Sequence, residues 1–314
     1  MRMVPAASLL VLIEAAACGG GFPSLTGAPD ASEESASDVA SEKPVEDAGA
    51  CDLQKPFGAA APLAGADLAS GFDYAPTLTN DELTLLFSSL RDDSGTFSHI
   101  YETSRPSTAS AFGTSAAISV NGPTNDSDPA LTPDGLTLYF QSDRAGNMGD
   151  IYVATRSSLG ADFGSVASVD AVNTADDDTQ PALDVDGSLW LASTRAGGQG
   201  GYDLFRAAPS AGTFAAPVAE TELNSTEDDW SPTLTADGLT IFFASTRGGG
   251  QGGYDIYFAS RPSIADPFST PQPLSELNTG ENELPHWLSR DGCRLYLERS
   301  QGNAYEMYVA TRGK

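Results

Sequence analysis

The sequence predicts an all-β protein, a five-bladed β-propeller of four-stranded blades that is closed by an N-terminal outer strand. One motif, a proline followed by an acidic turn and an apolar run, recurs five times at intervals of 51 to 53 residues. No stretch shows sustained helical periodicity, and five copies at this period are typical of propeller blades. The marker prolines of the motif are Pro76, Pro129, Pro181, Pro232 and Pro285.

Each copy divides into strands a to d, from the channel outward, and residues 129–168 illustrate the division. A short strand a at 129–131 leads into the turn Asp134-Gly135, a favoured hairpin sequence. Strand b at 136–142 is almost wholly apolar, as expected for a sheet packed on both faces. A glycine-rich b–c loop and strand c at 150–156 follow, and a phenylalanine then opens strand d.

The phenylalanines that open strand d are Phe112, Phe163, Phe214 and Phe268. A similar segment begins at Phe57, before the first copy, and none follows the last strand c. We therefore expect the N-terminal segment to supply strand d to the last blade and close the ring, with the propeller spanning residues 56–314.

Residues 1–55 are expected to export and tether the propeller. A short apolar stretch after Arg2 ends in small residues and Cys18, as in bacterial lipoprotein signals, although Glu14 interrupts the apolar run. Residues 1–18 are thus predicted to be a signal whose Cys18 is lipidated; the alternative is an ordinary secretory signal. Residues 19–55 have the small, polar and acidic composition of a disordered tether. Gly19 after the cysteine favours the outer membrane.

The charge balance excludes one class of partner and points to structural arginines. Against 43 acidic residues stand 16 basic ones, a net charge of -27, which repels nucleic acid. Beyond residue 56 the only lysine is Lys314, whereas arginine occurs twelve times. Arginine forms fixed, forked hydrogen bonds, so many of these residues are expected to hold the fold together.

A ring of acids is predicted on the face that carries the b–c loops. Three residues before each marker proline stands an acid or its amide: Asp73, Asp126, Asp178, Asp229 and Asn282. The b–c loops open with arginine in four copies and glutamine in the fifth: Arg91, Arg144, Arg195, Arg247 and Gln301. Because the copy without the arginine also lacks the aspartate, we predict Asp–Arg pairs in four blades and an uncharged pair in the fifth.

The alternative for this face is a ligand site. Further acids flank the ring: Asp176, Asp177, Glu227, Asp228 and Glu281. Spare carboxylates at a channel mouth suit Ca²⁺, or a cationic or hydroxylated ligand. Ca²⁺ is the one cofactor that this pattern suggests; whether the ring binds a metal stays open.

Catalytic signals are weak. The two histidines, His99 and His286, have no cysteine or convincing third ligand beside them, and no nucleophile elbow, phosphate loop or zinc-protease motif occurs. Glycosidases need two carboxylates across a channel, and this chain has acids to spare. Because the acids recur with the repeat, the pattern favours a scaffold over a unique catalytic pair.

A disulfide between Cys51 and Cys293 is predicted. With Cys18 assigned to lipid, two cysteines remain in an exported chain, where disulfides persist. Cys293 lies beside the turn that precedes strand b of the last blade, and Cys51 lies six residues before Phe57. The six residues from Cys51 to Phe57 are long enough to cross strand c and reach Cys293, so the bond would lock the ring closure.

The repeat resembles the WD40-like propeller repeats of the TolB type. The residues that carry the resemblance are Pro129 to Gly135, Ser142-Asp143-Arg144 and Asp150-Ile151-Tyr152, together with the loops at 197–203 and 249–255. The resemblance implies a propeller and an envelope setting but no single function. We expect a monomeric, lipid-anchored binding or scaffold module, not an enzyme, for an envelope protein or glycan; the alternative is a glycan-active hydrolase.

Overall fold

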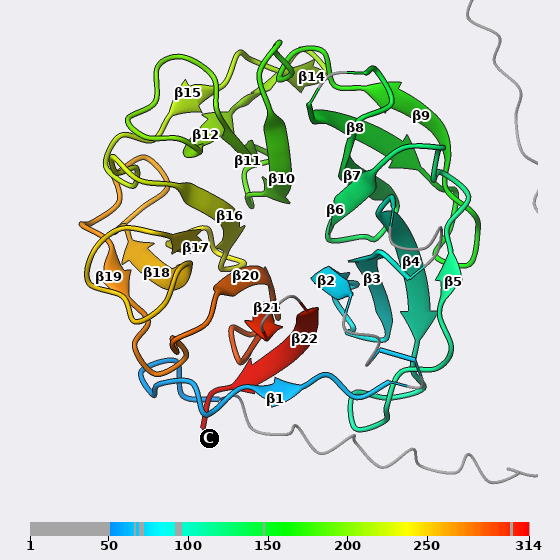
Figure 1. The fold of residues 1–314 in the computed structure, drawn as a ribbon, viewed down its shortest axis with the longest axis horizontal. Coiled ribbons are helices and arrows are strands. Elements are labelled where there is room, and N and C mark those ends of the chain that lie inside the picture. The colour runs from blue at the N-terminus through cyan, green and yellow to red at the C-terminus, as the bar shows by residue number, and fades with distance from the viewer. Residues whose placement is uncertain are drawn as a thin grey trace, which may run out of the picture. The chain divides into compact units, whose positions relative to one another are not determined.

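The computed structural model describes residues 51–313, except residue 66 and residues 69–71, 92–95, 147 and 302–303. Five four-stranded antiparallel sheets stand around a central axis, and the described part contains no helix, so the predicted fold is confirmed (Figure 1). Within these residues no helix is long and apolar enough to span a bilayer. Cys18 lies outside the described residues.

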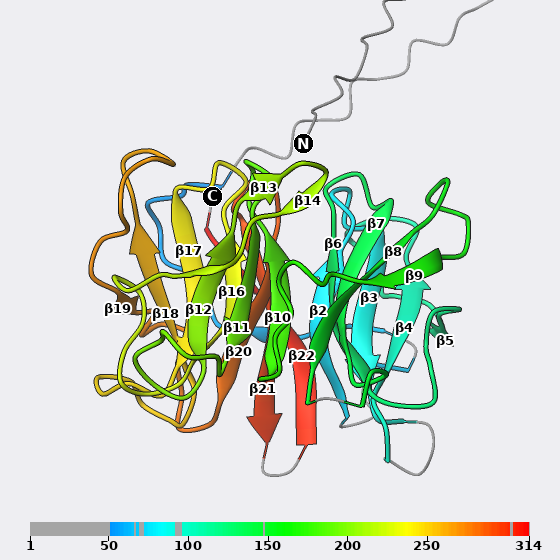
Figure 2. The ribbon, with the colours of Figure 1, turned by 90° about the horizontal axis from the view of Figure 1, so that it is seen from above.

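Each blade is a meander whose innermost strand faces the axis (Figures 1 and 2). The first three blades comprise β2 (Asp73–Leu78), β3 (Thr84–Ser89), β4 (His99–Ser104) and β5 (Ala116–Ala117); β6 (Asp126–Leu131), β7 (Thr137–Ser142), β8 (Asp150–Thr155) and β9 (Gly164–Ser168); and β10 (Asp178–Leu183), β11 (Leu189–Ser193), β12 (Asp203–Ala207) and β15 (Val218–Ala219). The last two comprise β16 (Asp229–Leu234), β17 (Thr240–Ser245), β18 (Asp255–Ser260) and β19 (Gln272–Pro273); and β20 (Glu283–Leu288), β21 (Arg294–Gln301), β22 (Ala304–Thr311) and β1 (Ala61–Pro62). A small hairpin, β13 (Pro209–Ser210) and β14 (Thr213–Phe214), precedes β15.

Strand a is longer than the sequence suggested. In four blades it begins at the ring acid, three residues before the proline, and contains an irregularity in its pairing with strand b; in the fifth it begins at Glu283. In four blades the residue before the proline has a positive φ of 50° to 52°. The proline has no N–H to donate to strand b. It lies where the register shifts, so no hydrogen bond of the ladder is lost there. These four residues are Ala75, Asp128, Gln180 and Ser231.

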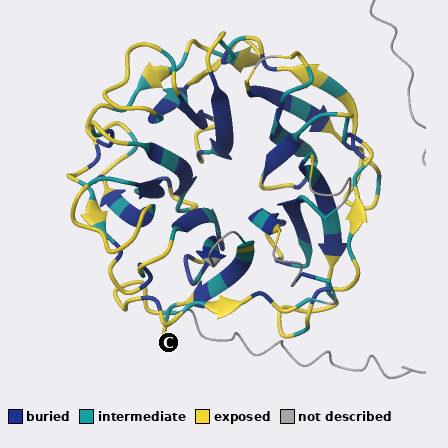
Figure 3. Ribbon diagram, in the orientation of Figure 1, coloured by how far each residue is buried: buried dark blue, intermediate teal, exposed yellow. Residues whose placement is uncertain are grey.

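The core lies between the blades and is apolar, while the outer strands are largely exposed (Figure 3). A second set of arginines joins the a–b turn to the phenylalanine that precedes strand d, in all blades but the third. In four blades the Nε of an arginine donates to a turn carbonyl, and its guanidinium lies 4.1 to 4.4 Å from the centre of a phenylalanine ring. The arginines are Arg105, Arg156, Arg261 and Arg312, on Phe112, Phe163, Phe268 and Phe57. Three of the phenylalanines that open strand d, and Phe57 before β1, are thus buried anchors.

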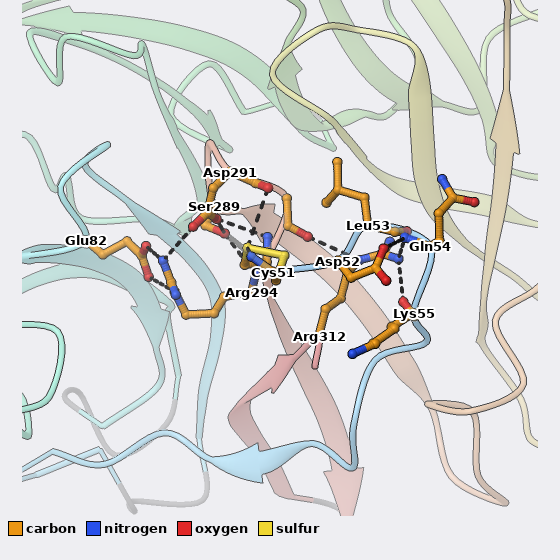
Figure 4. The surroundings of a disulfide bond; sticks show 12 residues. Cys51, Asp52, Leu53, Gln54, Lys55, Glu82, Ser289, Asp291, Arg294 and Arg312 are labelled. Carbon is orange, nitrogen blue, oxygen red and sulfur yellow. Dashed lines mark hydrogen bonds and ion pairs between the residues drawn. A yellow bond between two sulfur atoms is a disulfide. The ribbon is translucent and has the colours of Figure 1, made fainter. Parts of the chain in front are cut away.

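The ring closes as predicted, because β1 pairs with β22 and supplies the outer strand of the last blade. A disulfide joins Cys51 to Cys293, with 5.6 Å between the Cα atoms (Figure 4). Arg312 donates to the carbonyl oxygens of Leu53 and Lys55 at 2.8 and 3.0 Å.

A charged contact joins the first and last blades as well (Figure 4). Glu82 is buried and accepts hydrogen bonds from the Arg294 guanidinium and the Tyr296 hydroxyl of the last blade. Glu82 also occupies the turn position taken by glycine in the other blades, with a φ of 58°. Glu82 thus has a strained backbone conformation and is also a residue through which the first blade contacts the last.

Candidate functional site

The predicted ring acids are structural junctions in four blades. Asp73, Asp126, Asp178 and Asp229 are each 0% exposed and pair with the expected arginines. In the second blade the Arg144 Nη2 lies 2.6 Å from the Asp126 Oδ1, and the other carboxylate oxygen accepts the Gly122 N–H. Asp126, Asp178 and Asp229 therefore each fasten a b–c loop and a d–a loop to the first residue of strand a, and Asp73 fastens its b–c loop in the same way.

The arginines of these junctions also lie over the aromatic residue of strand c. Their guanidinium carbons stand 4.9 to 5.2 Å from the ring centres, close enough for cation–π attraction. The pairs are Arg91 with Tyr101, Arg144 with Tyr152, Arg195 with Phe205 and Arg247 with Tyr257. This accounts for the repeating aromatic residue.

The prediction for the fifth blade was wrong. Its junction is charged, between Glu283 and Arg299, with 2.8 Å from Nε to Oε1. Arg299 extends from β21 directly opposite Glu283, because β21 and β22 continue as a hairpin where other blades have a glycine-rich loop. Asn282 instead accepts the Tyr254 N–H, and Gln301 is the last residue of β21.

A cavity of about 450 Å³ lies at the channel end formed by the b–c loops and the first residues of strand a. Its wall combines aromatic, hydroxyl, amide and carboxylate side chains from all five blades. Because the ring acids are enclosed in their junctions, the groups available to a ligand are the residues beside them. The channel has a second cavity of about 510 Å³ at its other end, where His286 and Trp287 contribute to the wall.

Five aromatic side chains gather at the first cavity. The ring of Trp230 stacks on Tyr202, with 5.2 Å between centres and 19° between planes, and Tyr254 lies 5.6 Å away on the same indole. Across the cavity Tyr74 and Tyr305 lie 6.3 Å apart. Together these five residues, which we call the aromatic cluster, form part of the cavity wall.

Carboxylates hold the tyrosines of this cluster. The hydroxyl of Tyr202 donates to Asp177, and that of Tyr254 donates to Asp228 at 3.1 Å. Burial and these carboxylates raise the pKa of both phenols, so both stay protonated donors. Asp177 and Asp228 belong to the flanking acids that the sequence marked as spare, and only Asp177 is part of the cavity wall.

Two further acids in the wall have no counterpart in other blades. Asp128 occupies the place of Ala75, Gln180 and Ser231, and Glu298 lies opposite Leu284 at a position that carries no other acid. The Asp128 carboxylate accepts from Gln180 Nε2 at 2.8 Å and from Ser127 Oγ at 3.0 Å.

The two acids differ in their surroundings. Burial raises the pKa of Asp128 to about 6, and the nearby negative charge of Glu298 adds to the rise. Glu298 accepts from the Ala75 N–H at 3.2 Å and lies 3.0 Å from His286 Nε2. Burial thus disfavours the charge on Asp128, whereas Glu298 contacts a backbone N–H and an imidazole.

The histidines do not form a shared site. His99 contacts the Gly122 carbonyl oxygen through Nε2 at 3.2 Å, whereas His286 contacts Glu298. In the described ranges no group of three His, Cys, Asp or Glu side chains is arranged to hold a metal ion.

The sequence contained a signal for the aromatic cluster that was not used. Tyr202 and Tyr254 are the tyrosines of the Gly-Gly-Gln-Gly-Gly-Tyr-Asp loops, and Tyr74 and Trp230 each follow a ring acid. Once the acid is known to point into its junction, strand alternation directs the next residue toward the channel. Asp128 and Glu298 could be found only by searching the repeats for unmatched acids.

No protein-family model and no curated protein matches the sequence. Among solved structures, TolB from Acinetobacter baumannii matches with a TM-score of 0.47 and 20% identity over 77% of this chain, which spans 55% of that chain. A GH62 α-L-arabinofuranosidase catalytic domain from Coprinopsis cinerea matches with a TM-score of 0.53 and 13% identity, covering 82% of this chain and 97% of that one.

An α-L-arabinofuranosidase from Podospora anserina, solved in complex with cellotriose, matches with a TM-score of 0.54 and 12% identity over 84% of this chain and 98% of that one. At these identities the likeness concerns the fold alone.

Proposed function

We propose that this chain is a lipid-anchored binding module of the cell envelope whose propeller recognises a glycan at the cavity bearing the aromatic cluster. The cluster is the observation that carries the proposal. Sugar rings present flat C–H faces that pack on aromatic rings, and their hydroxyls donate to carboxylates. A partly apolar cavity with a few fixed polar groups suits a small ligand of this kind.

The fold neighbours support a carbohydrate ligand by analogy. Two of the solved structures with TM-scores above 0.5 are α-L-arabinofuranosidases, and one of them holds cellotriose. The analogy concerns the ligand class only, and the cavity of this chain supplies the residue-level argument.

Calorimetric titration of the protein with soluble oligosaccharides tests the proposal. We expect binding that Trp230→Ala weakens by roughly tenfold or more, because the variant removes the centre of the aromatic cluster. Trp287→Ala is the matched control, since Trp287 belongs to the cavity at the other end of the channel. The proposal fails if no oligosaccharide binds, or if Trp230→Ala binds as well as the parent protein.

A glycan-active hydrolase is the second candidate, and the unmatched acids Asp128 and Glu298 favour it. Two carboxyl groups at one cavity, one of them with a raised pKa, are the kind of pair that glycoside hydrolysis uses. If this candidate holds, product release from the bound glycan disappears in Asp128→Asn and in Glu298→Gln, while both variants still bind. Binding without any product release supports the binding module alone.

The anchor has its own test. We propose that Cys18 carries the lipid and that the protein is attached to the outer membrane. Cys18→Ser is expected to move the protein from the membrane to the soluble fraction on cell fractionation. Retention of the variant in the membrane fraction would contradict the lipid assignment.

A further inference from the structure

We infer that the glycan bound at the aromatic cluster carries a free, positively charged amino group; this inference rests on the proposed function. The wall of the cavity contains three carboxylates, Asp128, Asp177 and Glu298, and within the described residues it contains no lysine or arginine. A ligand cation would therefore meet acceptors on several sides and no competing positive charge in the wall.

Asp177 provides the most specific observation. It is 9% exposed, and its Oδ2 accepts the Tyr202 hydroxyl. Its Oδ1 is buried and has no hydrogen-bond partner in the part of the chain that the structure describes. A buried carboxylate oxygen without a donor is costly, and a donor from a ligand would remove that cost.

The surroundings of Asp177 supply no cation. Oδ1 lies close to the backbone of Gly149, where a Cβ would come within 2.5 Å of it, so a glycine at this position lets the unpartnered carboxylate occupy the cavity wall. Arg195, on the same blade, is engaged by Asp178 and by the Val172 carbonyl oxygen. Burial, together with the charges of Asp143 and Asp178, raises the pKa of Asp177, as expected for a carboxylate whose charge is uncompensated.

The aromatic cluster adds attraction for a cation and a donor for a sugar oxygen. Stacked aromatic faces carry negative electrostatic potential and attract an ammonium group. The Nε1 of Trp230 is buried without a hydrogen-bond partner among the described residues. An amino sugar fits both unmatched groups, since its ammonium donates to Asp177 and its hydroxyl and ring oxygens can accept from Trp230.

A matched set of ligands tests the inference on the full-length protein. Oligomers of β-1,4-linked glucosamine, of N-acetylglucosamine and of glucose share a linkage and differ at the second carbon. At a pH where the amine is protonated, we expect the glucosamine oligomer to bind roughly tenfold more tightly than the other two. We also expect its affinity to fall as salt is added.

Two variants test whether the preference for the amino oligomer depends on Asp177 or on the acidic surface in general. Asp177→Asn should abolish the preference for the amino oligomer, whereas Asp176→Asn, an exposed neighbour, should leave it unchanged. A melting curve for each variant checks that it is folded. The comparison of the three oligomers uses the parent protein, so it tests the inference even if a variant does not fold.

The outcomes distinguish this inference from the proposed function. Equal binding of all three oligomers, lost in Trp230→Ala, overturns the inference and leaves glycan binding intact. If no oligomer binds but oligolysine binds and depends on Asp177, a cationic peptide replaces the glycan and both statements fail.

Discussion

Neighbouring carboxylates in this propeller differ in role because of their partners. Asp178 is fully buried, accepts hydrogen bonds from Ser193 and Thr174, and pairs with Arg195. Asp177, one residue earlier, has no such cation and lies in the cavity wall. A single step along the chain thus separates a group that holds the loops from a group that is available to a ligand.

The junction of Asp178 and Arg195 is expected to be strongly coupled. Asp178→Asn strands the guanidinium and Arg195→Met strands the carboxylate, so each single variant should lose more stability than the double variant does. Urea unfolding of the four proteins should give a coupling free energy of about 1–3 kcal/mol.

The more exposed pair Arg206–Asp186 is the control for this cycle, with a coupling of about 1 kcal/mol or less. If the losses of stability in the Asp178 and Arg195 variants are purely additive, the pairing of these two residues does not stabilise the protein.

Asp128 should make the protein less stable at neutral pH than in mild acid. Its pKa is about 6 in the folded protein and has an ordinary value of 3.8, so the folded state binds this proton more tightly. Its favourable contribution is present below pH 3.8 and is lost as the pH rises through about 6. Asp128→Asn should therefore stabilise the protein by about 2–3 kcal/mol at neutral pH and have little effect at about pH 4.

Asp134→Asn is a control of opposite sign for the Asp128 experiment. Its hydrogen bond from Thr132 lowers the pKa of Asp134, so its contribution is present at neutral pH and is lost as the pH falls. Denaturant titrations at both pH values compare the two variants. An Asp128→Asn variant that is less stable than the parent at neutral pH would show that hydrogen bonding at this carboxylate outweighs burial of its charge.

At the scale of elements, the b–c loops are packed structures rather than free connections. In the third and fourth blades, Asp203 and Asp255 accept two loop N–H groups each, from Gln199 and Gly200 and from Gln251 and Gly252. The loop backbone also lies against the next d–a loop, which places Tyr202 and Tyr254 at the cavity. Glycine occurs here because the backbones approach closely.

Gly252→Ala tests the loop packing. A Cβ at this position would lie 1.9 Å from the Glu281 carbonyl oxygen, so either the loop or its neighbour must move. We expect a loss of about 1–3 kcal/mol in thermal or urea unfolding, together with weaker ligand binding because Tyr254 shifts. Gly248→Ala is the matched control, since its Cβ would meet no atom within 4 Å. Equal stability of the two variants would mean that the loop yields freely.

The elements were more predictable than their ends and irregularities. Turn aspartates, marker prolines and the phenylalanines before strand d located every blade, because each has one structural reason to recur. The predicted strand a was shorter than the observed one, because its first residues are polar. Its positive-φ position also has no residue preference that a single sequence reveals. The fifth junction was missed because Glu283 and Arg299 are displaced by one and two residues from the repeat positions of the other blades.

At the scale of the whole molecule, stability depends on joining the first blade to the last. The inner strands of neighbouring blades pack side chains, and the β1–β22 pairing, the Glu82–Arg294 contact and the disulfide are among the contacts that tie the first described residues and the first blade to the last blade. The sequence indicated the first and the third of these from an unmatched phenylalanine segment and a leftover pair of cysteines. It did not reveal Glu82, which stands where other turns have glycine.

The disulfide should be the largest single contribution to this closure. It joins residues 242 apart in sequence, for which chain-entropy theory gives about 5 kcal/mol. In urea unfolding, a Cys51→Ala, Cys293→Ala chain should lose up to that amount of unfolding free energy, and reducing agent should destabilise the parent protein equally. Hydrogen exchange should then accelerate first in β1, because its two residues pair only with β22. A Cys18→Ser chain unfolded without reductant should show no reactive thiol, and two thiols per chain would mean that the bond is absent and the closure rests on β1 and Glu82.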